Sequence, residues 1–95
     1  MNISTSSNIV TITGNIKTIN DFQEIKSTLD TTKSQHSSMT INIIDSLSIT
    51  SSVIGYFNKL ILKDKIKLNM NIGNEKLLEL INDLNLVSIF NAKRA

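Results

Sequence analysis

Residues 39–55 read MTINIIDSLSITSSVIG, and this stretch decides the predicted fold. Its first part, residues 39–44, is rich in β-branched and other apolar residues, which favours a strand in the middle of a sheet that is covered on at least one face. Residues 45–49 are predicted to form a connecting loop. Beyond it, apolar residues recur at helical spacing, and Thr50 or Ser51 is a suitable N-cap. A strand, a short loop and a helix in this order are typical of an α/β protein.

The residues before this stretch show the same alternation. Residues 8–13 are mostly β-branched and are predicted to form a strand, which the turn-forming pair Gly14-Asn15 ends. A further, weaker strand is expected near Ile3. Residues 19–29 carry apolar side chains at helical spacing, and residues 31–38 are predicted to form the loop that follows this helix.

The residues after the stretch continue the pattern. Residues 66–72 alternate strictly between apolar and polar side chains, which is typical of a half-buried strand. Residues 75–84 are predicted to form a third helix, residues 86–90 a short final strand or an extended tail, and Lys93-Arg94 a solvated tail. The order β-α-β-α-β-α-β predicts one α/β domain over residues 1–95, with a mixed, mostly parallel sheet and helices packed on it.

Composition limits the classes of partner and of chemistry. The chain has 95 residues, 10 Lys and Arg against 8 Asp and Glu, and a formal net charge of +2, without the basic face that a nucleic-acid partner requires. It has no cysteine, which excludes disulfides and thiolate metal sites. Neither a signal-peptide pattern nor an apolar run of membrane-spanning length is present, so we expect a cytoplasmic protein without membrane insertion.

Sequence patterns typical of enzymes are missing. There is no phosphate-binding glycine loop, no nucleophile elbow and no pair of histidines for a metal. The sole histidine, His36, lies in a predicted polar loop, where we expect it to be exposed to solvent rather than catalytic. We therefore expect a non-enzymatic protein with no cofactor, no metal and no small-molecule substrate.

Two residues of the opening stretch carry structural expectations of their own. Gly55 lies inside the predicted second helix, where glycine costs about 1 kcal/mol relative to alanine, so we expect close backbone packing at this position. Asp45 lies at the carboxyl end of a predicted strand, where open α/β sheets place their sites. It is expected to position the loop, to bind a cation of a partner, or simply to form the turn.

The segment from Ile49 to Gly55 resembles the signature of STAS domains, the sulfate-transporter and anti-sigma-factor-antagonist domains. In that signature a hydrophobic residue is followed by Asp-Ser-Ser-Gly-Leu-Gly. Aligned without gaps, the Asp, the two serines and the two glycines of the family fall on Thr50, Ser51, Ser52, Val53 and Gly55. Residues 10–14 resemble the first strand of the family with its glycine, and residues 67–90 resemble its closing part, so the resemblance spans nearly the whole chain.

The resemblance implies a bacterial regulator of transcription that works by binding proteins. In the anti-sigma-factor antagonists, the first serine of the motif is phosphorylated by a serine kinase that is also the anti-sigma factor, and a phosphatase resets the system. This implies Ser51 as the phosphorylation site, with Ser52 and Thr50 as further acceptors. The implied partner-binding residues are Asp45, Thr50, Ser51, Ser52, Val53, Ile54 and Tyr56. From the residues alone, plain helix capping is the better explanation of Thr50 and Ser51.

Two other functions are compatible with the sequence. The first is a constitutive STAS subunit that docks on a partner such as a lipid-transport ABC ATPase and needs no phosphate. The second is a module that binds a small ligand or a nucleotide, which only the position of the loop at the carboxyl ends of the strands supports.

Overall fold

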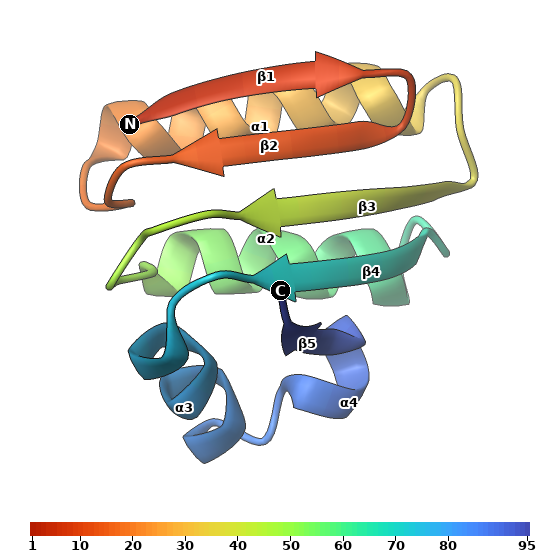
Figure 1. The fold of residues 1–95 in the computed structure, drawn as a ribbon. Helices are drawn as coiled ribbons and strands as arrows, with labels where there is room; N and C mark the ends of the chain where they lie inside the picture. Colours follow the sequence, from red (N-terminus) through yellow and green to blue (C-terminus); the bar gives the residue numbers. More distant parts are fainter.

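The computed structural model describes all 95 residues, and its strands form one five-stranded sheet (Figure 1). The elements are, in chain order, β1 (Asn2–Ser6), β2 (Ile9–Thr13), α1 (Ile19–Lys33), β3 (Ser38–Ile43), α2 (Ser51–Leu62), β4 (Lys67–Ile72), α3 (Glu75–Asp83), α4 (Val87–Phe90) and β5 (Ala92–Arg94). The strand order is β1-β2-β3-β4-β5, with β1 antiparallel to β2 and every other pair parallel. This confirms the predicted α/β class with its mixed, mostly parallel sheet, and the weak strand expected near Ile3 is β1.

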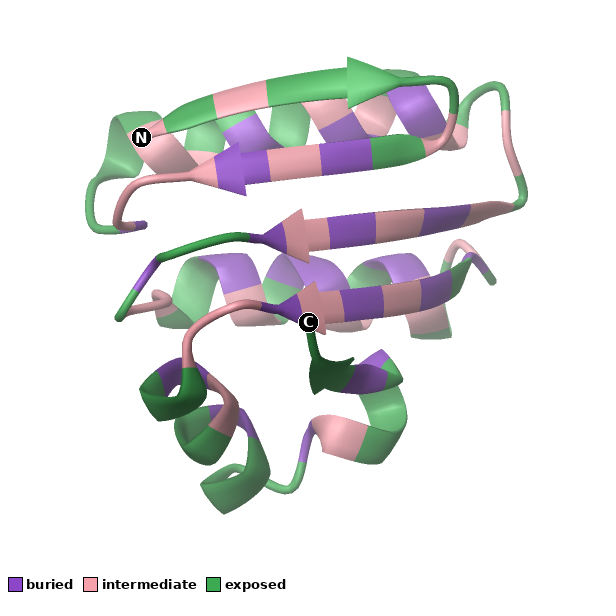
Figure 2. Cartoon of the chain, in the orientation of Figure 1, coloured by how far each residue is buried: buried purple, intermediate pink, exposed green.

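The period-two pattern of β2, β3 and β4 separates the two faces of the sheet. Alternate residues of these strands are buried, and they are Val10, Ile12, Met39, Ile41, Ile43, Leu68, Met70 and Ile72. The residues between them are mostly small and polar, and most are half-buried, as the alternating colours of the strands in Figure 2 show. Helices α1 and α2 lie behind the strands in Figure 1, and no helix covers the front of β1 to β4. The core therefore lies between the sheet and these two helices.

The C-terminal part corrects the sequence expectation. Residues 86–90 were predicted as a strand or a tail, but the segment from Val87 to Phe90 is the short helix α4. Phe90 is fully buried and packs edge-to-face on Phe57 of α2, with 5.7 Å between the ring centroids. Asn91 then adopts a left-handed conformation with φ of 49°, which turns the chain so that Ala92 can pair with β4. The predicted solvated tail is thus part of an edge strand, although the side chains of Lys93 and Arg94 are exposed.

Helix α1 is longer than predicted and reaches Lys33, inside the predicted exit loop. Leu29 and Thr32 are both buried, so the last turn of α1 still packs on the core and gains from remaining helical. None of the helices is both long and apolar enough to span a membrane.

Tyr56 of α2 connects the two helices behind the sheet. Its hydroxyl donates a hydrogen bond to Asp30 of α1, and its ring packs edge-to-face on Phe22, with 6.4 Å between the centroids. The ammonium groups of Lys26 and Lys59 lie 5.8 and 5.7 Å from the centre of the ring. Burial and then the hydrogen bond to Asp30 raise the pKa of Tyr56. These contacts fix the position of α2, and with it the position of its first residues.

Candidate functional site

The first turn of α2 lies just after the carboxyl end of β3. Thr50 is the N-cap, and its hydroxyl oxygen accepts a hydrogen bond from the backbone N–H of Val53 at 3.3 Å. Ser51 and Ser52 are the first two residues of the helix, and both are exposed. The backbone N–H groups of Ser51 and Ser52 have no acceptor in the chain, and neither hydroxyl group forms a hydrogen bond with another residue. The start of α2 therefore presents two free donors beside two free hydroxyls, at the end of the helix that carries partial positive charge.

Asp45 holds the loop before α2 to the loop before α1. Its Oδ1 accepts a hydrogen bond from the backbone N–H of Gly14 at 2.7 Å. Two residues later, the backbone N–H of Leu47 donates to Oδ1 of Asn15 at 2.8 Å. Of the functions expected for Asp45, the structure thus shows the positioning of the loop.

Ser46 and Ser48 join the same two loops through hydrogen bonds on the buried side. The completely buried hydroxyl of Ser46 accepts a hydrogen bond from the backbone N–H of Ile16 at 3.1 Å and donates to the carbonyl of Ser48 at 2.7 Å. Ser48 in turn donates from its hydroxyl to the carbonyl of Ile16 at 2.9 Å. Sequence reasoning missed both serines, because their main contact lies about thirty positions away and no local pattern signals it.

A small hollow of about 100 Å³ lies between the starts of α1 and α2. It is lined by Lys17, Thr18, Ile19, Phe22, Thr50 and Ser52. Just before α1, the carboxylate of Asp21 accepts hydrogen bonds from the N–H groups of Lys17 and Thr18, and these bonds lower the pKa of Asp21. The N–H groups of Ile19 and Asn20 in α1 have no acceptor in the chain, like those of Ser51 and Ser52 in α2. The two helix ends differ in charge, since the first turn of α1 carries the carboxylate of Asp21 and the first turn of α2 carries no acidic residue. Lys17, in the lining of the hollow, adds a positive charge.

Exposed apolar side chains accompany the hydroxyl groups. Ile19, at the start of α1, is 76% exposed, and Leu47, in the loop before α2, is 55% exposed. Ile54, one turn into α2, is half-buried. We call Ile19, Leu47, Thr50, Ser51, Ser52 and Ile54 the α2 N-terminal surface. Ile19 and Leu47 are two of the eight large apolar side chains that the chain leaves exposed, so their exposure alone does not mark a binding surface.

Two residues predicted to contact a partner lie instead in the core. Val53 is completely buried, and only 5% of Tyr56 is exposed. They belong to the buried stripe of α2, which turns their side chains towards the sheet and α1, so the expectation of direct partner contact is corrected for both. Gly55 is the opposite case. It is exposed, and nothing lies within 4 Å of the place its Cβ would take, so the close packing expected there does not exist within the chain.

The remaining candidates lie away from this surface. His36 is half-buried in the connection before β3, at the other end of that strand from α2. No group of three or more His, Asp and Glu side chains is placed to hold a metal ion.

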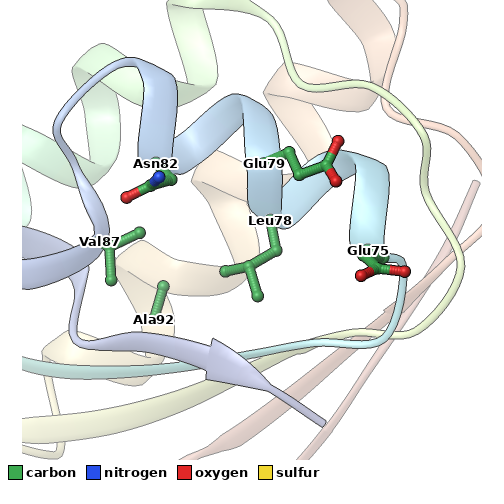
Figure 3. Close-up of a pocket in the computed structure, with 6 residues that line it drawn as sticks. All are labelled: Glu75, Leu78, Glu79, Asn82, Val87 and Ala92. Atoms are coloured by element: carbon green, nitrogen blue, oxygen red, sulfur yellow. The ribbon is translucent and has the colours of Figure 1, made fainter.

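The larger hollow of the molecule contains none of the predicted site residues. It is a groove of about 320 Å³ between α3 and the segment of α4 and β5, shown in Figure 3. Leu78, Val87 and Ala92 form its apolar part, and Glu75, Glu79 and Asn82 are its polar residues. Both carboxylates are exposed and neither forms a salt bridge, so the groove has the character of an open surface.

The hydroxyl groups at the start of α2 have no catalytic group beside them within the chain. No residue of the chain hydrogen-bonds to the hydroxyl of Ser51 or Ser52, so no general base lies within hydrogen-bond distance of either hydroxyl. Comparison with known proteins finds no matching family model, and no curated protein or solved structure with significant similarity.

Proposed function

We propose that this chain is a non-catalytic, protein-binding regulator of the STAS type, which a partner kinase switches by phosphorylating Ser51. The observation that carries the proposal is the exposed Ser51 hydroxyl in the first turn of α2, next to backbone N–H groups that no residue of the chain uses. The proposed partners are a serine kinase that acts as an anti-sigma factor and a phosphatase that resets the switch, all in the cytoplasm.

The physical effect of a phosphate at this place supports a switch. A phosphate adds about −1.5 to −2 charges at neutral pH. The free N–H groups and the positive end of α2 stabilise this charge, and Lys17 lines the hollow next to it, so the modified chain stays folded. A partner that covers Ile19 and Leu47 would have to remove water from the phosphate. This costs several kcal/mol unless the partner offers a positive group that pairs with the phosphate. Phosphorylation therefore releases the partner.

Ser51 is favoured over its two neighbours by their contacts. The hydroxyl of Thr50 already caps the helix, so modifying it would disturb the fold. Ser52 lines the hollow beside α1, where a bulky phosphate has less space. Ser51 is exposed and does not line the hollow, which leaves it accessible to a kinase.

The test is intact-protein mass spectrometry with site mapping, on the chain expressed in its own cells and purified. We expect a single phosphate on Ser51, none on the Ser51→Ala variant, and unchanged phosphorylation of the Ser52→Ala control. In co-purification from the same cells, Ser51→Asp should retain the partner about tenfold less than the wild type. A chain that carries no phosphate while its kinase is shown to be active would contradict the switch.

The exposed apolar residues Ile19 and Leu47 favour a second candidate, a constitutive subunit that docks on a partner such as a lipid-transport ABC ATPase. This function needs the apolar contact but no phosphate. It predicts that Ser51→Ala keeps full activity in cells, whereas Leu47→Asp loses it. The switch predicts that Ser51→Ala stays bound to its partner permanently and fixes the pathway in one state.

A further inference from the structure

The two edges of the sheet differ in how well they are protected. The β5 edge is only three residues long and carries Lys93 and Arg94. The β1 edge is five residues long, pairs with β2 in continuous register without a bulge, and contains no charged residue, no proline and no glycine. Natural proteins protect exposed strand edges with charges, prolines, bulges or short strands. The β1 edge has none of these, so its free backbone groups remain available to another strand.

The charges of the chain select a second copy as that other strand. The first sixteen residues contain no charged side chain, and Lys17 is the first. A second copy of the β1–β2 hairpin therefore brings no charged side chain to the seam, and in an antiparallel pair the two amino groups of Met1 lie at opposite ends of it. At the opposite edge, self-pairing would bring Lys93 and Arg94 of two copies together, which is unfavourable.

We propose that β1 pairs with β1 of a second copy in antiparallel direction, around a two-fold axis through Ser4. The two sheets then become one continuous sheet of ten strands. In this register Ser4 lies opposite Ser4 of the second copy, and Ile3 lies opposite Thr5 of the second copy. Within the chain, Ile3 pairs with Ile12 of β2 and Thr5 pairs with Val10. Ile12 and Val10 are buried, so Ile3 and Thr5 lie on the face of the sheet that carries the core. The pairing thus satisfies free backbone groups and covers part of the half-buried Ile3 without moving any residue to the wrong face.

This inference does not depend on the proposed function. Helix α2 packs over β3 and β4, so β2 and α1 separate it from the β1 edge, and the residues Thr50, Ser51, Ser52 and Ile54 stay open in both copies (Figure 1). A seam of five residues per copy is smaller than a standard interface, so we expect a dimer that forms reversibly with rising concentration.

Cysteine crosslinking tests the register directly, because the chain contains no cysteine of its own. Directly opposed residues of antiparallel strands have Cα atoms about 4.5 to 5.5 Å apart, which a disulfide can bridge. We expect Ser4→Cys to form a disulfide-linked dimer at least about tenfold faster than Lys93→Cys, the matched control on the β5 edge, because pairing raises the effective thiol concentration. Equal rates for the two variants would overturn the proposal.

A charge-reversal pair tests the association without a covalent bond. Ser4→Lys and Ser4→Glu each place like charges opposite one another, so each is expected to be monomeric in analytical ultracentrifugation at concentrations where the wild type dimerises. An equimolar mixture of the two should form the heterodimer. Circular dichroism and thermal melts of each variant verify that the monomer is folded. A wild type that stays monomeric at millimolar concentration, or folded variants that do not associate when mixed, would show the inference to be wrong.

Discussion

At the scale of single residues, Gly55 and Gly73 place opposite demands on the chain. A Cβ on Gly73 would lie 2.0 Å from the carbonyl oxygen of Ile44, because the chain passes directly beside the end of β3, where the N–H of Gly73 donates to Ile43 at 2.8 Å. Gly55 lies in the middle of α2 with open space where a Cβ would be. Gly73 is required by a close backbone contact, whereas Gly55 only weakens its helix.

Alanine substitutions at these two glycines should therefore change stability in opposite directions. We expect Gly73→Ala to lower the free energy of unfolding by about 2 kcal/mol or more, since backbone atoms must move to admit the methyl group. We expect Gly55→Ala to raise it by about 0.5 to 1 kcal/mol, the helix propensity difference. Urea denaturation of both variants measures the two values, and a loss of stability in Gly55→Ala would show a packing role that the structure does not contain.

The more stable Gly55→Ala variant also probes the proposed docking. Gly55 is exposed one turn after Ser51 and gives a partner access to the backbone of α2. If the partner approaches α2 there, the added methyl group weakens binding although the chain itself is more stable. Isothermal titration with the purified partner is the measurement, and unchanged affinity would confine the docking to the residues before Gly55.

At the scale of elements, the start of α2 carries one hydroxyl group that caps the helix and another that makes no hydrogen bond within the chain. Thr50 accepts the hydrogen bond that caps the helix, whereas the hydroxyl of Ser51 has no partner in the chain. We expect Thr50→Ala to lower the free energy of unfolding by about 1 kcal/mol and Ser51→Ala to change it by less than about 0.5 kcal/mol. Chemical denaturation compares the two. An equal loss in both variants would mean that Ser51 serves the helix rather than a partner.

The elements also show what could be predicted from the sequence. The alternation in residues 66–72 predicted β4 correctly, and the β-branched residues of 8–13 predicted β2 correctly. Each pattern is local and long enough to repeat. The segment from Val87 to Phe90 was mispredicted as a strand or tail, since its four residues are too few to show a helical period and the burial of Phe90 against α2 decides its conformation. The three residues of β5 give no periodic signal, and only the turn at Asn91 brings them to the sheet.

The candidate site could be predicted only in part, for the same reason. Its location at the start of α2 and the capping by Thr50 follow from residues that are neighbours in the sequence. The positions of Val53 and Tyr56 in the core depend on which side of α2 faces the sheet. The buried hydrogen bonds of Ser46 join two loops that are far apart in the chain, which no local pattern indicates.

At the scale of the whole molecule, the ion pairs are concentrated in one place. Two of the four salt bridges lie within α1, and the other two join Lys33 of α1 and Lys59 of α2 to Asp64 in the turn after α2. The cluster consists of Lys26, Asp30, Lys33, Lys59 and Asp64. Partial burial alone would raise the pKa of Asp30, but the hydrogen bond from Tyr56 and the contacts with Lys26 and Lys33 outweigh it, so the pKa is lowered. The hydrogen bond from Lys33, and then that from Lys59, lower the pKa of Asp64 despite its partial burial. The hydrogen bond to Asp64 raises the pKa of Lys33.

These shifts determine how the stability of the fold depends on pH. A carboxyl group whose pKa is lowered by folding stabilises the native state above its usual value of 3.8, and this contribution is lost as the pH falls through its pKa in the folded state. The raised pKa values of Lys33 and Tyr56 act in the other direction. Their contributions are complete below the usual values of 10.5 and 10.0 and are lost as the pH rises above them.

We therefore expect the free energy of unfolding to be nearly constant between about pH 5 and pH 9 and to fall on both sides of this range. Urea denaturation at a series of pH values, at constant salt, gives the profile. The double variant Asp30→Asn with Asp64→Asn should show a clearly smaller decline in acid, because it lacks two of the carboxylates that folding holds ionised. The matched control is Asp83→Asn, an exposed carboxylate at the end of α3 without a salt bridge, which should keep the decline of the wild type. If the double variant loses stability in acid as steeply as this control, the α1–α2 cluster does not govern the response of the fold to pH.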